Sequence, residues 1–348
     1  MMSSLTGCGT SSQNGSAAAN SEPTAETTPS ASADTATADL GSKKIGVCIY
    51  DFADFFMSSF RRELENYLIS RGFDLANITI ADGANDHETQ MKDIQSLIDE
   101  GVDVLVVNPV MTSEAPAITD MVVKAGIPLV YINREPDADE EARWKENGWN
   151  VTYVGCDARQ TGTMQGRIIA DLGLDAVDFN GNGKVDYIMI KGDPENIDAK
   201  YRTEFSIKAL TDAGMDTVCL SEQEGNWDQT LAQQLVENAL GQYGENIEVV
   251  FCNNDEMALG ALVALTDAGR TVGKDVYLLG VDALPEACEE IIAGKMTGTV
   301  FNDYIAQSHN SADAAINFLN GSGNEYYISA DSIMVTKDNA QSILDFQG

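Results

Sequence analysis

The feature that most constrains this chain is an alternation, from Lys43 onward, of short apolar β-rich runs with amphipathic stretches. One of these stretches carries Phe56, Phe60 and Leu64 about one helical turn apart, as expected of a helix that buries one face. Apolar strands that alternate with helices predict parallel sheets covered by helices on both faces. The runs with the length and composition of strands are 45–50, 78–81, 104–108, 129–133, 151–155, 187–190, 217–220, 249–252, 276–281 and 298–301.

The number of strands and the length of 348 residues indicate two domains rather than one. Residues 135–150 are polar and rich in charge, and they divide the runs near the middle. We therefore predict an α/β protein with two doubly wound, Rossmann-like parallel-sheet domains and a ligand cleft between them. In sheets of this kind the ligand lies beyond the carboxyl ends of the strands.

An aspartate or asparagine stands at the carboxyl end of several predicted strands. Such side chains also begin helices as N-caps, and each of them alone has that structural explanation. Several such side chains at equivalent sheet edges indicate a sugar-binding site. Sugar hydroxyls donate and accept hydrogen bonds at once, and planar carboxylates and amides satisfy them. The residues predicted at these edges are Asp54, Asn133, Asn254, Asp282 and Asn302.

The composition argues against several classes of function. Acidic residues outnumber basic ones by 55 to 21, for a formal net charge of −34, so no nucleic acid or anionic membrane surface is expected as a partner. No apolar run reaches the ~18 residues that a membrane-spanning helix needs. The 6 cysteines stand singly and there are only 2 histidines, so neither a zinc site, a disulfide framework nor a histidine-based triad is predicted.

The first 42 residues are expected to lie outside the fold. Residues 9–42 are almost entirely small, polar or acidic, with no large aliphatic side chain before Leu40, and this composition predicts a flexible tether. Residues 5–8 read Leu-Thr-Gly-Cys, which resembles a bacterial lipobox and predicts lipid attachment at Cys8. The positively charged and apolar parts of a signal peptide are missing ahead of this motif.

Residues 178–186, with the sequence DFNGNGKVD, resemble the first nine positions of an EF-hand calcium loop. Position 12 of such a loop should be glutamate but is Met189, inside a predicted strand, so a helix-flanked EF-hand is excluded. An Asn/Gly turn without metal is the alternative. The residues that would offer oxygens to Ca²⁺, one of them through its backbone carbonyl, are Asp178, Asn180, Asn182, Lys184 and Asp186.

A wider resemblance rests on the order and spacing of several segments along the chain. They are IGVCIY (45–50) with Asp54 and Phe56, NREP (133–136), KGDP (191–194), NNDEMA (253–258), GVDALPEA (280–287) and GTVFND (298–303). From Lys43 to the last helix the chain is thereby similar to the galactose/glucose-binding proteins of bacterial ABC transport, which are periplasmic binding proteins of the type I fold.

The resemblance implies a site between the domains in which a phenylalanine and a tryptophan sandwich the sugar, here Phe56 and Trp227. Asn196 stands where the family usually has histidine, which leaves the preferred hexose open. For the calcium loop, the resemblance implies a distant bidentate ligand at Glu248 and a structural Ca²⁺. The implied hydrogen-bonding residues are Asp54, Asn133, Asp198, Arg202, Asn254, Asp282 and Asn302.

The resemblance also implies how such a protein works. Two domains joined by a multi-strand hinge close around a monosaccharide, D-glucose or D-galactose, and present it to a membrane ABC permease, with a chemotaxis receptor as a further partner. The expected lobes are 43–150 with 304–323, and 151–303 with 324–348. We expect a monomer outside the cytoplasm, either lipid-anchored to the outer face of the cell membrane or periplasmic.

Three alternatives stay open at this point. A clamp of the same fold for ribose or a sugar-derived signal would differ only in its ligand. A glycoside-processing enzyme would need a carboxyl group of raised pKa, and Arg202, four residues after Asp198 on one helix face, should keep Asp198 ionised. A sugar-responsive repressor would need DNA-binding helices, which the Ser/Thr/Ala-rich N-terminal segment does not provide.

Overall fold

A computed structural model describes residues 39–348. Each predicted strand region forms a β-strand, and two further strands, β11 (Tyr327–Ala330) and β12 (Ser332–Val335), follow near the C-terminus. The predicted α/β class and the two parallel sheets are confirmed. Cys8 and nearly all of the predicted tether lie outside the described residues.

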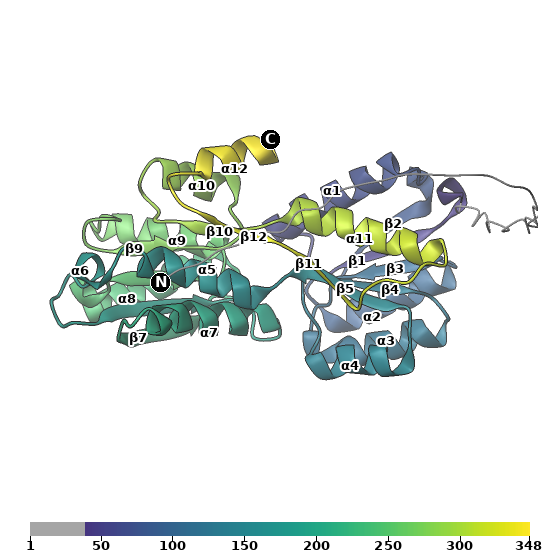
Figure 1. The fold of residues 1–348 in the computed structure, drawn as a ribbon, viewed down its shortest axis with the longest axis horizontal. Helices are drawn as coiled ribbons and strands as arrows, with labels where there is room; N and C mark the ends of the chain where they lie inside the picture. The colour runs from purple at the N-terminus through teal and green to yellow at the C-terminus, as the bar shows by residue number, and fades with distance from the viewer. Residues whose placement is uncertain (1–38) are drawn as a thin grey trace, which may run out of the picture. The chain divides into compact units, whose positions relative to one another are not determined.

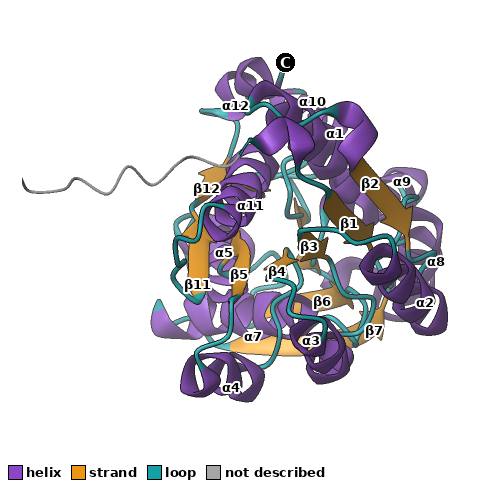
Figure 2. Cartoon of the chain, turned by 90° about the vertical axis from the view of Figure 1, so that its right-hand side faces the viewer, coloured by secondary structure: helices purple, strands orange, loops and turns teal. Residues whose placement is uncertain are grey.

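The first sheet contains six parallel strands in the order β11-β5-β4-β3-β1-β2. Along β1, Ile45 and Val47 pack under α1 and α11 on one face, whereas Cys48 packs under α2, α3 and α4 on the other (Figure 2). The elements are β1 (Ile45–Ile49), α1 (Phe55–Ser70), β2 (Ile78–Asp82), α2 (His87–Asp99), β3 (Val104–Val107), α3 (Ala115–Lys124), β4 (Leu129–Ile132), α4 (Ala138–Asn147), β5 (Val151–Cys156) and α11 (Tyr304–Leu319).

The second sheet contains four parallel strands in the order β7-β6-β8-β9. Along β6, Ile188 and Ile190 pack with α8, α9 and α10, whereas Tyr187 and Met189 pack with α5 and α7 on the opposite face. The elements are α5 (Ala158–Ala170), α6 (Leu174–Val177), β6 (Val185–Lys191), α7 (Ile197–Asp212), β7 (Thr217–Glu224), α8 (Gln229–Tyr243), β8 (Val249–Cys252), α9 (Asp255–Asp267), β9 (Tyr277–Leu279), α10 (Pro285–Ile292) and α12 (Ala340–Gln347).

Short 3₁₀ helices connect some of these elements, at Leu40–Ser42, Leu75–Asn77, Thr112–Glu114 and Gly244–Asn246. Strand β10 (Thr299–Asn302) pairs antiparallel with β12 and touches the second sheet through a bridge between Gly298 and Leu279. The chain passes between the two groups of elements after β5, after β10 and after β11 (Figure 1). Hereafter the first lobe is the first sheet with its helices and the loops that join them, and the second lobe is the rest of the described fold.

The lobe boundaries expected from sequence need correction. Strand β5 pairs in parallel with β4, and β11 pairs with β5, so both strands belong to the first sheet although residues 151–156 and 327–330 were expected in the second lobe. The charged stretch 135–150 is not a divider, because it contains α4, whose Trp144 is buried and stacks on Tyr131 with ring centroids 5.3 Å apart. Helix α11 contacts β3, β4 and β5 of the first sheet.

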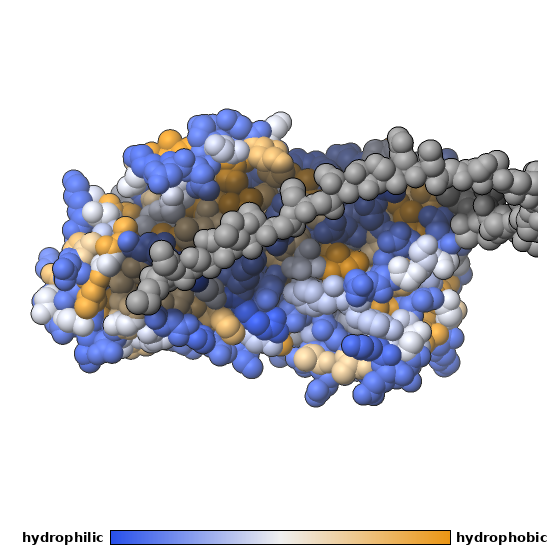
Figure 3. Space-filling model, viewed as in Figure 1, coloured by the Kyte–Doolittle hydropathy of each residue, from blue (hydrophilic) through white to orange (hydrophobic). Residues whose placement is uncertain are grey.

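The visible surface is mostly hydrophilic (Figure 3), as the charge-rich composition leads one to expect. The face of the molecule in Figure 3 carries mostly hydrophilic residues, with small apolar areas among them. Across residues 39–348, no helix combines the length and the apolar character that spanning a bilayer requires.

Candidate ligand-binding site

Side chains from both lobes line one cavity at the carboxyl ends of the strands. About 330 Å³ of empty space, part of it open to solvent, lies among these side chains. Of the predicted ligand-binding residues only Asp198 is absent from its wall, and Tyr50, Met57 and Arg134 line it without having been predicted. The predicted residues that line it are Asp54, Phe56, Asn133, Asn196, Arg202, Trp227, Asn254, Asp282 and Asn302.

Asp54, from the first lobe, caps α1 and also faces the cavity. Its Oδ1 accepts a hydrogen bond from the backbone N–H of Met57 at 2.7 Å, and its Oδ2 accepts one from the hydroxyl of Tyr50 at 2.6 Å. The N-cap explanation and the position in the cavity therefore apply to the same carboxylate. Phe56, one residue into the helix, is buried and packs edge-on against Tyr304 with ring centroids 6.4 Å apart.

Asn133 follows β4 with a φ of 60°, a left-handed conformation that asparagine tolerates better than most residues. Its backbone carbonyl accepts a hydrogen bond from the hydroxyl of Tyr153 at 2.8 Å. Its side-chain Oδ1 accepts one from the amide of Asn108 at 3.3 Å. These contacts hold the Asn133 amide at the wall of the cavity.

Trp227, from the second lobe, also has a positive φ, of 66°. Its ring lies so close to Gly192 that a Cβ at that glycine would come within 2.0 Å of the ring carbons. Only glycine allows this approach of an indole to the end of β6. The guanidinium of Arg202 lies 5.7 Å from the centre of the same ring.

Asn196 and Asn254 begin helices α7 and α9 as N-caps. The Oδ1 of Asn196 accepts from the backbone N–H of Asp198 at 3.0 Å, and the Oδ1 of Asn254 accepts from that of Met257 at 3.0 Å. Since each cap bond uses the single amide oxygen as acceptor, the NH₂ groups are the parts of both side chains with donor capacity for a ligand.

Arg202 is the charged centre of the second-lobe wall. Its Nη1 donates to the backbone carbonyl of Asn253 at 3.0 Å, its Nη2 lies 3.5 Å from Asp198 Oδ2, and its Nη1 lies 3.9 Å from Asp282 Oδ1. Within the described residues, neither the Nε of Arg202 nor the Oδ1 of Asp198 has a hydrogen-bond partner, and both are buried. Asp198 lies beside Arg202 and does not reach the cavity wall.

Burial raises the pKa of Asp198 to about 7, and the nearby charge of Arg202 opposes that rise without cancelling it. Desolvation therefore outweighs the attraction of Arg202, which was expected to keep Asp198 ionised. Burial likewise raises the pKa of Asp282 to about 7, again opposed by Arg202.

Asp282 is presented by a turn in which it and Ala283 have φ values of 118° and 56°. The buried carboxylate of Asp255 stabilises this turn by accepting from the backbone N–H of Leu284 at 2.8 Å and from the hydroxyl of Thr299 at 2.7 Å. Asn302 donates to Asp282 Oδ1 at 3.2 Å, so these two predicted ligand-binding residues are hydrogen-bonded to each other.

The residues of the calcium-type loop lie around Glu248, which is fully buried. Glu248 accepts backbone N–H bonds from Asn180 at 3.0 Å and from Asp186 at 2.9 Å. Asp186 Oδ2 accepts from the amides of Asn180 and Asn182 at 2.7 and 2.8 Å. Asp178 accepts the backbone N–H of Gly183 at 2.7 Å, and Lys184 donates its backbone N–H to Asn182 at 2.8 Å.

Two features of this loop bear on a cation. Burial, with the negative charges of Asp186 and Asp178 nearby, raises the pKa of Glu248. The Oδ1 of Asp186 is buried without a hydrogen-bond partner among the described residues. In that part of the chain, no group of three or more His, Cys, Asp or Glu side chains is gathered as a metal site.

Tyr50, Met57 and Arg134 are the wall residues that sequence reasoning missed. Tyr50 and Arg134 stand inside the segments that carry the family resemblance, next to predicted ligands in the chain, so position was the only signal for them. Arg134 is almost fully buried, and its guanidinium stacks on the ring of Tyr50 at 3.6 Å from the ring centre.

Comparisons with known proteins define the class. Residues 45–323 match the family described as periplasmic binding protein domain. The chain is 34% identical over 281 residues to the D-galactose/methyl-galactoside binding periplasmic protein of Haemophilus influenzae, covering 80% of this chain and 82% of that protein. It is also 34% identical over 305 residues to a putative rhizopine-binding protein of Rhizobium meliloti, covering 87% and 92% of the two chains.

A solved structure agrees with these relatives. An ABC transporter solute-binding protein from Bacillus halodurans with bound myo-inositol superposes with a TM-score of 0.76 at 30% identity, covering 89% of this chain and 99% of that one. The chain therefore belongs to the family of periplasmic binding proteins. Its relatives are ligand-binding proteins of transport, so this is a binding protein and not an enzyme.

Proposed function

We propose that the cavity between the lobes binds a single monosaccharide, with D-glucose and D-galactose as the first candidates, and that hinge closure around it prepares the sugar for an ABC permease. The broader assignment, a sugar-binding protein of ABC transport that works outside the cytoplasm, follows from the family and its relatives. The particular sugar is the new part of the proposal.

One observation carries this proposal. The cavity is walled by the aromatic residues Phe56 and Trp227 together with carboxylate, amide and guanidinium groups from both lobes. Flat aromatic faces pack against the C–H faces of a pyranose ring, and the polar groups around them satisfy its hydroxyls. A neutral, ring-shaped polyol is the ligand that uses both kinds of wall.

A different cyclic polyol is the second candidate. Asn196 replaces the family's histidine at the wall, and a similar structure holds myo-inositol while one relative is a ribose import binding protein. Sites that hydrogen-bond every hydroxyl discriminate sharply between analogues, so a single replaced side chain is enough to move the preference.

The proposal includes a structural Ca²⁺ in loop 178–186. The residues fit a hard cation, because they offer carboxylate and amide oxygens, and because Asp186 has a buried oxygen without a partner among the described residues. Asp178, Asn180, Asn182, the Lys184 carbonyl, Asp186 and Glu248 would hold it. Bound there, Ca²⁺ neutralises the clustered carboxylates and fixes the loop, without taking part in sugar binding.

The remaining elements of the proposal concern the setting of the protein. A monomer carries the sugar, the permease recognises the closed lobes, and a chemotaxis receptor is a further partner that recognises them. Lipidation of Cys8 would anchor the chain to the outer face of the membrane, and without it the protein would be periplasmic.

The test is a panel of thermal-unfolding measurements on calcium-loaded protein with D-glucose, D-galactose, D-ribose and myo-inositol. A ligand that binds only the folded state raises Tm in proportion to the logarithm of its concentration. We expect the largest shift with a hexose, and we expect Asn196→His to change the order of the sugars. A largest shift with myo-inositol or ribose would replace the hexose by the second candidate, and no shift with any of the four would refute the sugar proposal.

A further inference from the structure

Arg134 connects the two lobes at the wall of the ligand cavity. Its Nη1 donates to the carbonyl of Val110, within the first lobe, at 2.6 Å and to Asp193 Oδ2, in the second lobe, at 3.1 Å. Arg134 is 1% exposed, whereas Asp193 keeps about a fifth of its side-chain surface in solvent. The pair is therefore shielded on the arginine side, where a charged hydrogen bond is strongest.

Arg134 also lies between two cavities. A larger cavity, with about 1120 Å³ of empty space on the same measure, adjoins the ligand cavity, and both are lined by Tyr50, Arg134 and Trp227. Asp193 lines only the larger one. The Arg134–Asp193 pair thus stands where the two cavities meet.

The same arginine is linked to a predicted sugar ligand. Its guanidinium lies 3.6 Å from the centre of the Tyr50 ring, and the Tyr50 hydroxyl donates to Asp54 Oδ2 at 2.6 Å. A sugar hydroxyl bound at Asp54 weakens or strengthens the hydrogen bond between Tyr50 and Asp54. In this way it affects the position of the Tyr50 ring, on which Arg134 stacks. The chain of contacts runs from Asp54 through Tyr50 and Arg134 to Asp193 of the other lobe.

A second set of contacts between the lobes lies close by. The backbone N–H and the hydroxyl of Thr112, in the first lobe, both donate to the carbonyl of Glu195 in the second, at 3.0 and 2.9 Å. Ser113 donates to the Glu195 carboxylate at 2.9 Å. Glu195 follows Asp193 by two residues, so both sets of contacts join the same second-lobe segment to the first lobe.

We propose that Arg134 is the positioning residue that latches the lobes over the bound ligand. By pairing with Asp193 it closes the ligand cavity toward the larger cavity beside it, and through Tyr50 it senses the occupancy of Asp54. The inference rests on the proposed sugar-binding function, but its lobe-closing part concerns this chain with or without a sugar.

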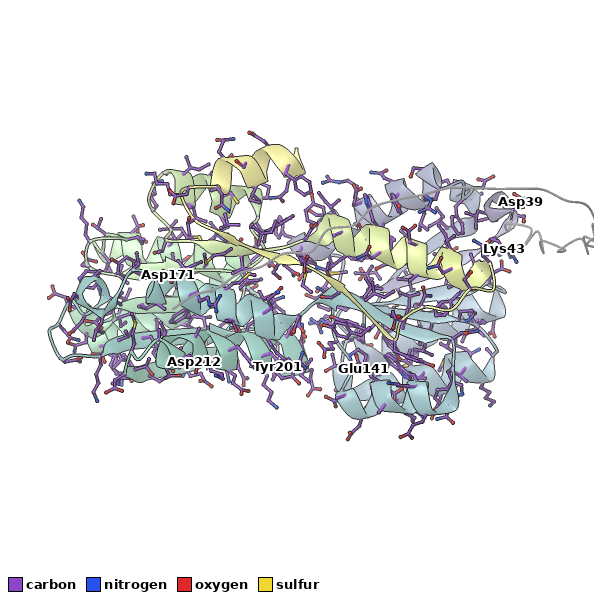
Figure 4. The ribbon with its side chains drawn as sticks, in the orientation of Figure 1. Asp39, Lys43, Glu141, Asp171, Tyr201 and Asp212 are labelled. Atoms are coloured by element: carbon purple, nitrogen blue, oxygen red, sulfur yellow. The ribbon has the colours of Figure 1, made fainter. Side chains whose placement is uncertain are left out.

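A second ion pair that joins the two lobes serves as a comparison. Arg159, in the second lobe, pairs with Glu135 at 3.1 Å and stacks on Tyr201 with its guanidinium 3.9 Å from the ring centre. Figure 4 labels Tyr201 on α7 and, in the first lobe, Glu141 on α4. Neither Arg159 nor Glu135 lines the ligand cavity, so this contact joins the lobes without closing over the ligand.

The experiment uses Arg134→Gln, Asp193→Asn, the double variant and the conservative Arg134→Lys in the full chain. Hydrogen exchange at the Thr112 amide reports lobe closure, because its acceptor is the Glu195 carbonyl of the other lobe. Stopped-flow dissociation of D-glucose or D-galactose, whichever binds, reports ligand escape. Arg71→Gln is the control, since Arg71 pairs with Asp313 on an exposed surface within the first lobe.

We expect Arg134→Gln and Asp193→Asn each to raise the sugar dissociation rate at least about tenfold and to speed exchange at Thr112, with little change in the association rate. Because Arg134 is almost fully buried and bonded to Val110, Arg134→Gln should also lower Tm, whereas Asp193→Asn should lower it less. The double variant should dissociate as fast as the faster of the two single variants. Arg134→Lys should raise the dissociation rate less than Arg134→Gln does, because lysine keeps the charge but loses the planar stack on Tyr50. Arg71→Gln should change neither reading.

Three results would overturn the latch. Additive effects of the two substitutions would show that the residues do not act as a pair, and unchanged dissociation in both would show that they do not retain the ligand. Fast exchange at Thr112 in the unaltered protein, with and without sugar, would show that the lobes do not close in this way. If no hexose binds while Thr112 exchange responds to the substitutions, the sugar assignment fails and the latch stands.

Discussion

The two walls of the ligand cavity are built differently. On the first-lobe wall the carboxylate of Asp54 has partners for both oxygens, a backbone N–H and the Tyr50 hydroxyl. Arg202 on the second-lobe wall and its partner Asp198, which does not reach the wall, each keep a buried polar atom without a partner among residues 39–348. The pKa of both Asp198 and Asp282 is raised to about 7.

This difference indicates a division of work. Buried polar groups without partners are costly, so a ligand that supplies hydroxyls to the second wall removes an existing penalty there. The first wall is already satisfied and gains less from each contact. We infer that the sugar docks on the second lobe and that the first lobe then closes over it, with Arg134 holding the closed arrangement.

The largest effect is expected at Arg202. Replacing it with methionine leaves Asp198 and Asp282 buried without their counter-charge, and we expect sugar affinity to fall at least about 100-fold, or about 2.7 kcal/mol. Isothermal titration calorimetry measures the affinity, with Arg202→Lys as the control that retains the charge. A tenfold loss or less in Arg202→Met would contradict the leading role of the second wall.

A matched pair of aromatic substitutions separates the order of events. Trp227→Leu should lower the association rate and raise the dissociation rate, because the sugar loses its docking face, with a total loss of about 10- to 100-fold in affinity. Phe56→Leu should act mainly on dissociation, because that ring arrives with the closing lobe. Stopped-flow fluorescence gives both rates. If the two substitutions changed the association and dissociation rates in the same way, the proposed order of docking and closure would be contradicted.

The pH dependence should report the second wall. Asp198 and Asp282 lose their protons near pH 7 in the folded protein and near pH 4 when unfolded. Below pH 7 they are increasingly neutral and leave Arg202 without an anionic partner, so sugar affinity should fall by about tenfold as the pH drops from 8 to 5. Calorimetry at several pH values measures this, and a flat profile would show that the ionisation of these two carboxyl groups does not control sugar binding.

The same two groups act on the unliganded fold with the opposite sign. The folded state binds protons that the unfolded state releases between about pH 4 and pH 7, so their contribution to stability is greatest below pH 4 and is lost as the pH rises to 7. Asp198→Asn should reduce that decline. Chemical unfolding at pH 5 and pH 8, with and without the substitution, tests this.

The smallest effect on sugar binding is expected from the calcium-type loop. Chelation of Ca²⁺ or the substitution Glu248→Gln should lower Tm by several degrees while changing sugar affinity less than about twofold, because none of the loop residues lines the cavity. Asp175→Asn, near the loop but outside its ligand set, is the control. A Tm that does not respond to chelation would favour the metal-free turn.

The strands and most of the site could be predicted from sequence for identifiable reasons. Runs such as 104–108 are apolar on both sides, as buried parallel strands are, and Asp54 or Asn254 mark strand ends directly. The spacing of the family segments placed Trp227 and Asn196, which carry no local signal strong enough to assign a role.

Other features depend on folding in three dimensions. Stretch 135–150 looked like a divider because its surface is charged, and the burial of Trp144 against Tyr131 becomes visible only in the packed sheet. Strand β11 was missed because it gains its apolar neighbours from β5, far away in the chain. Arg134 has a partner in the other lobe, so sequence could assign it no role.

The most direct measurement is a calorimetric titration of D-glucose and D-galactose into the calcium-loaded chain at pH 8, with recovery of the sugar afterwards. The account predicts saturable one-to-one binding of at least one hexose, the sugar recovered unchanged, and loss of that heat in Arg202→Met. Binding of neither hexose, or an affinity that Arg202→Met leaves intact, would contradict the assignment of this cavity.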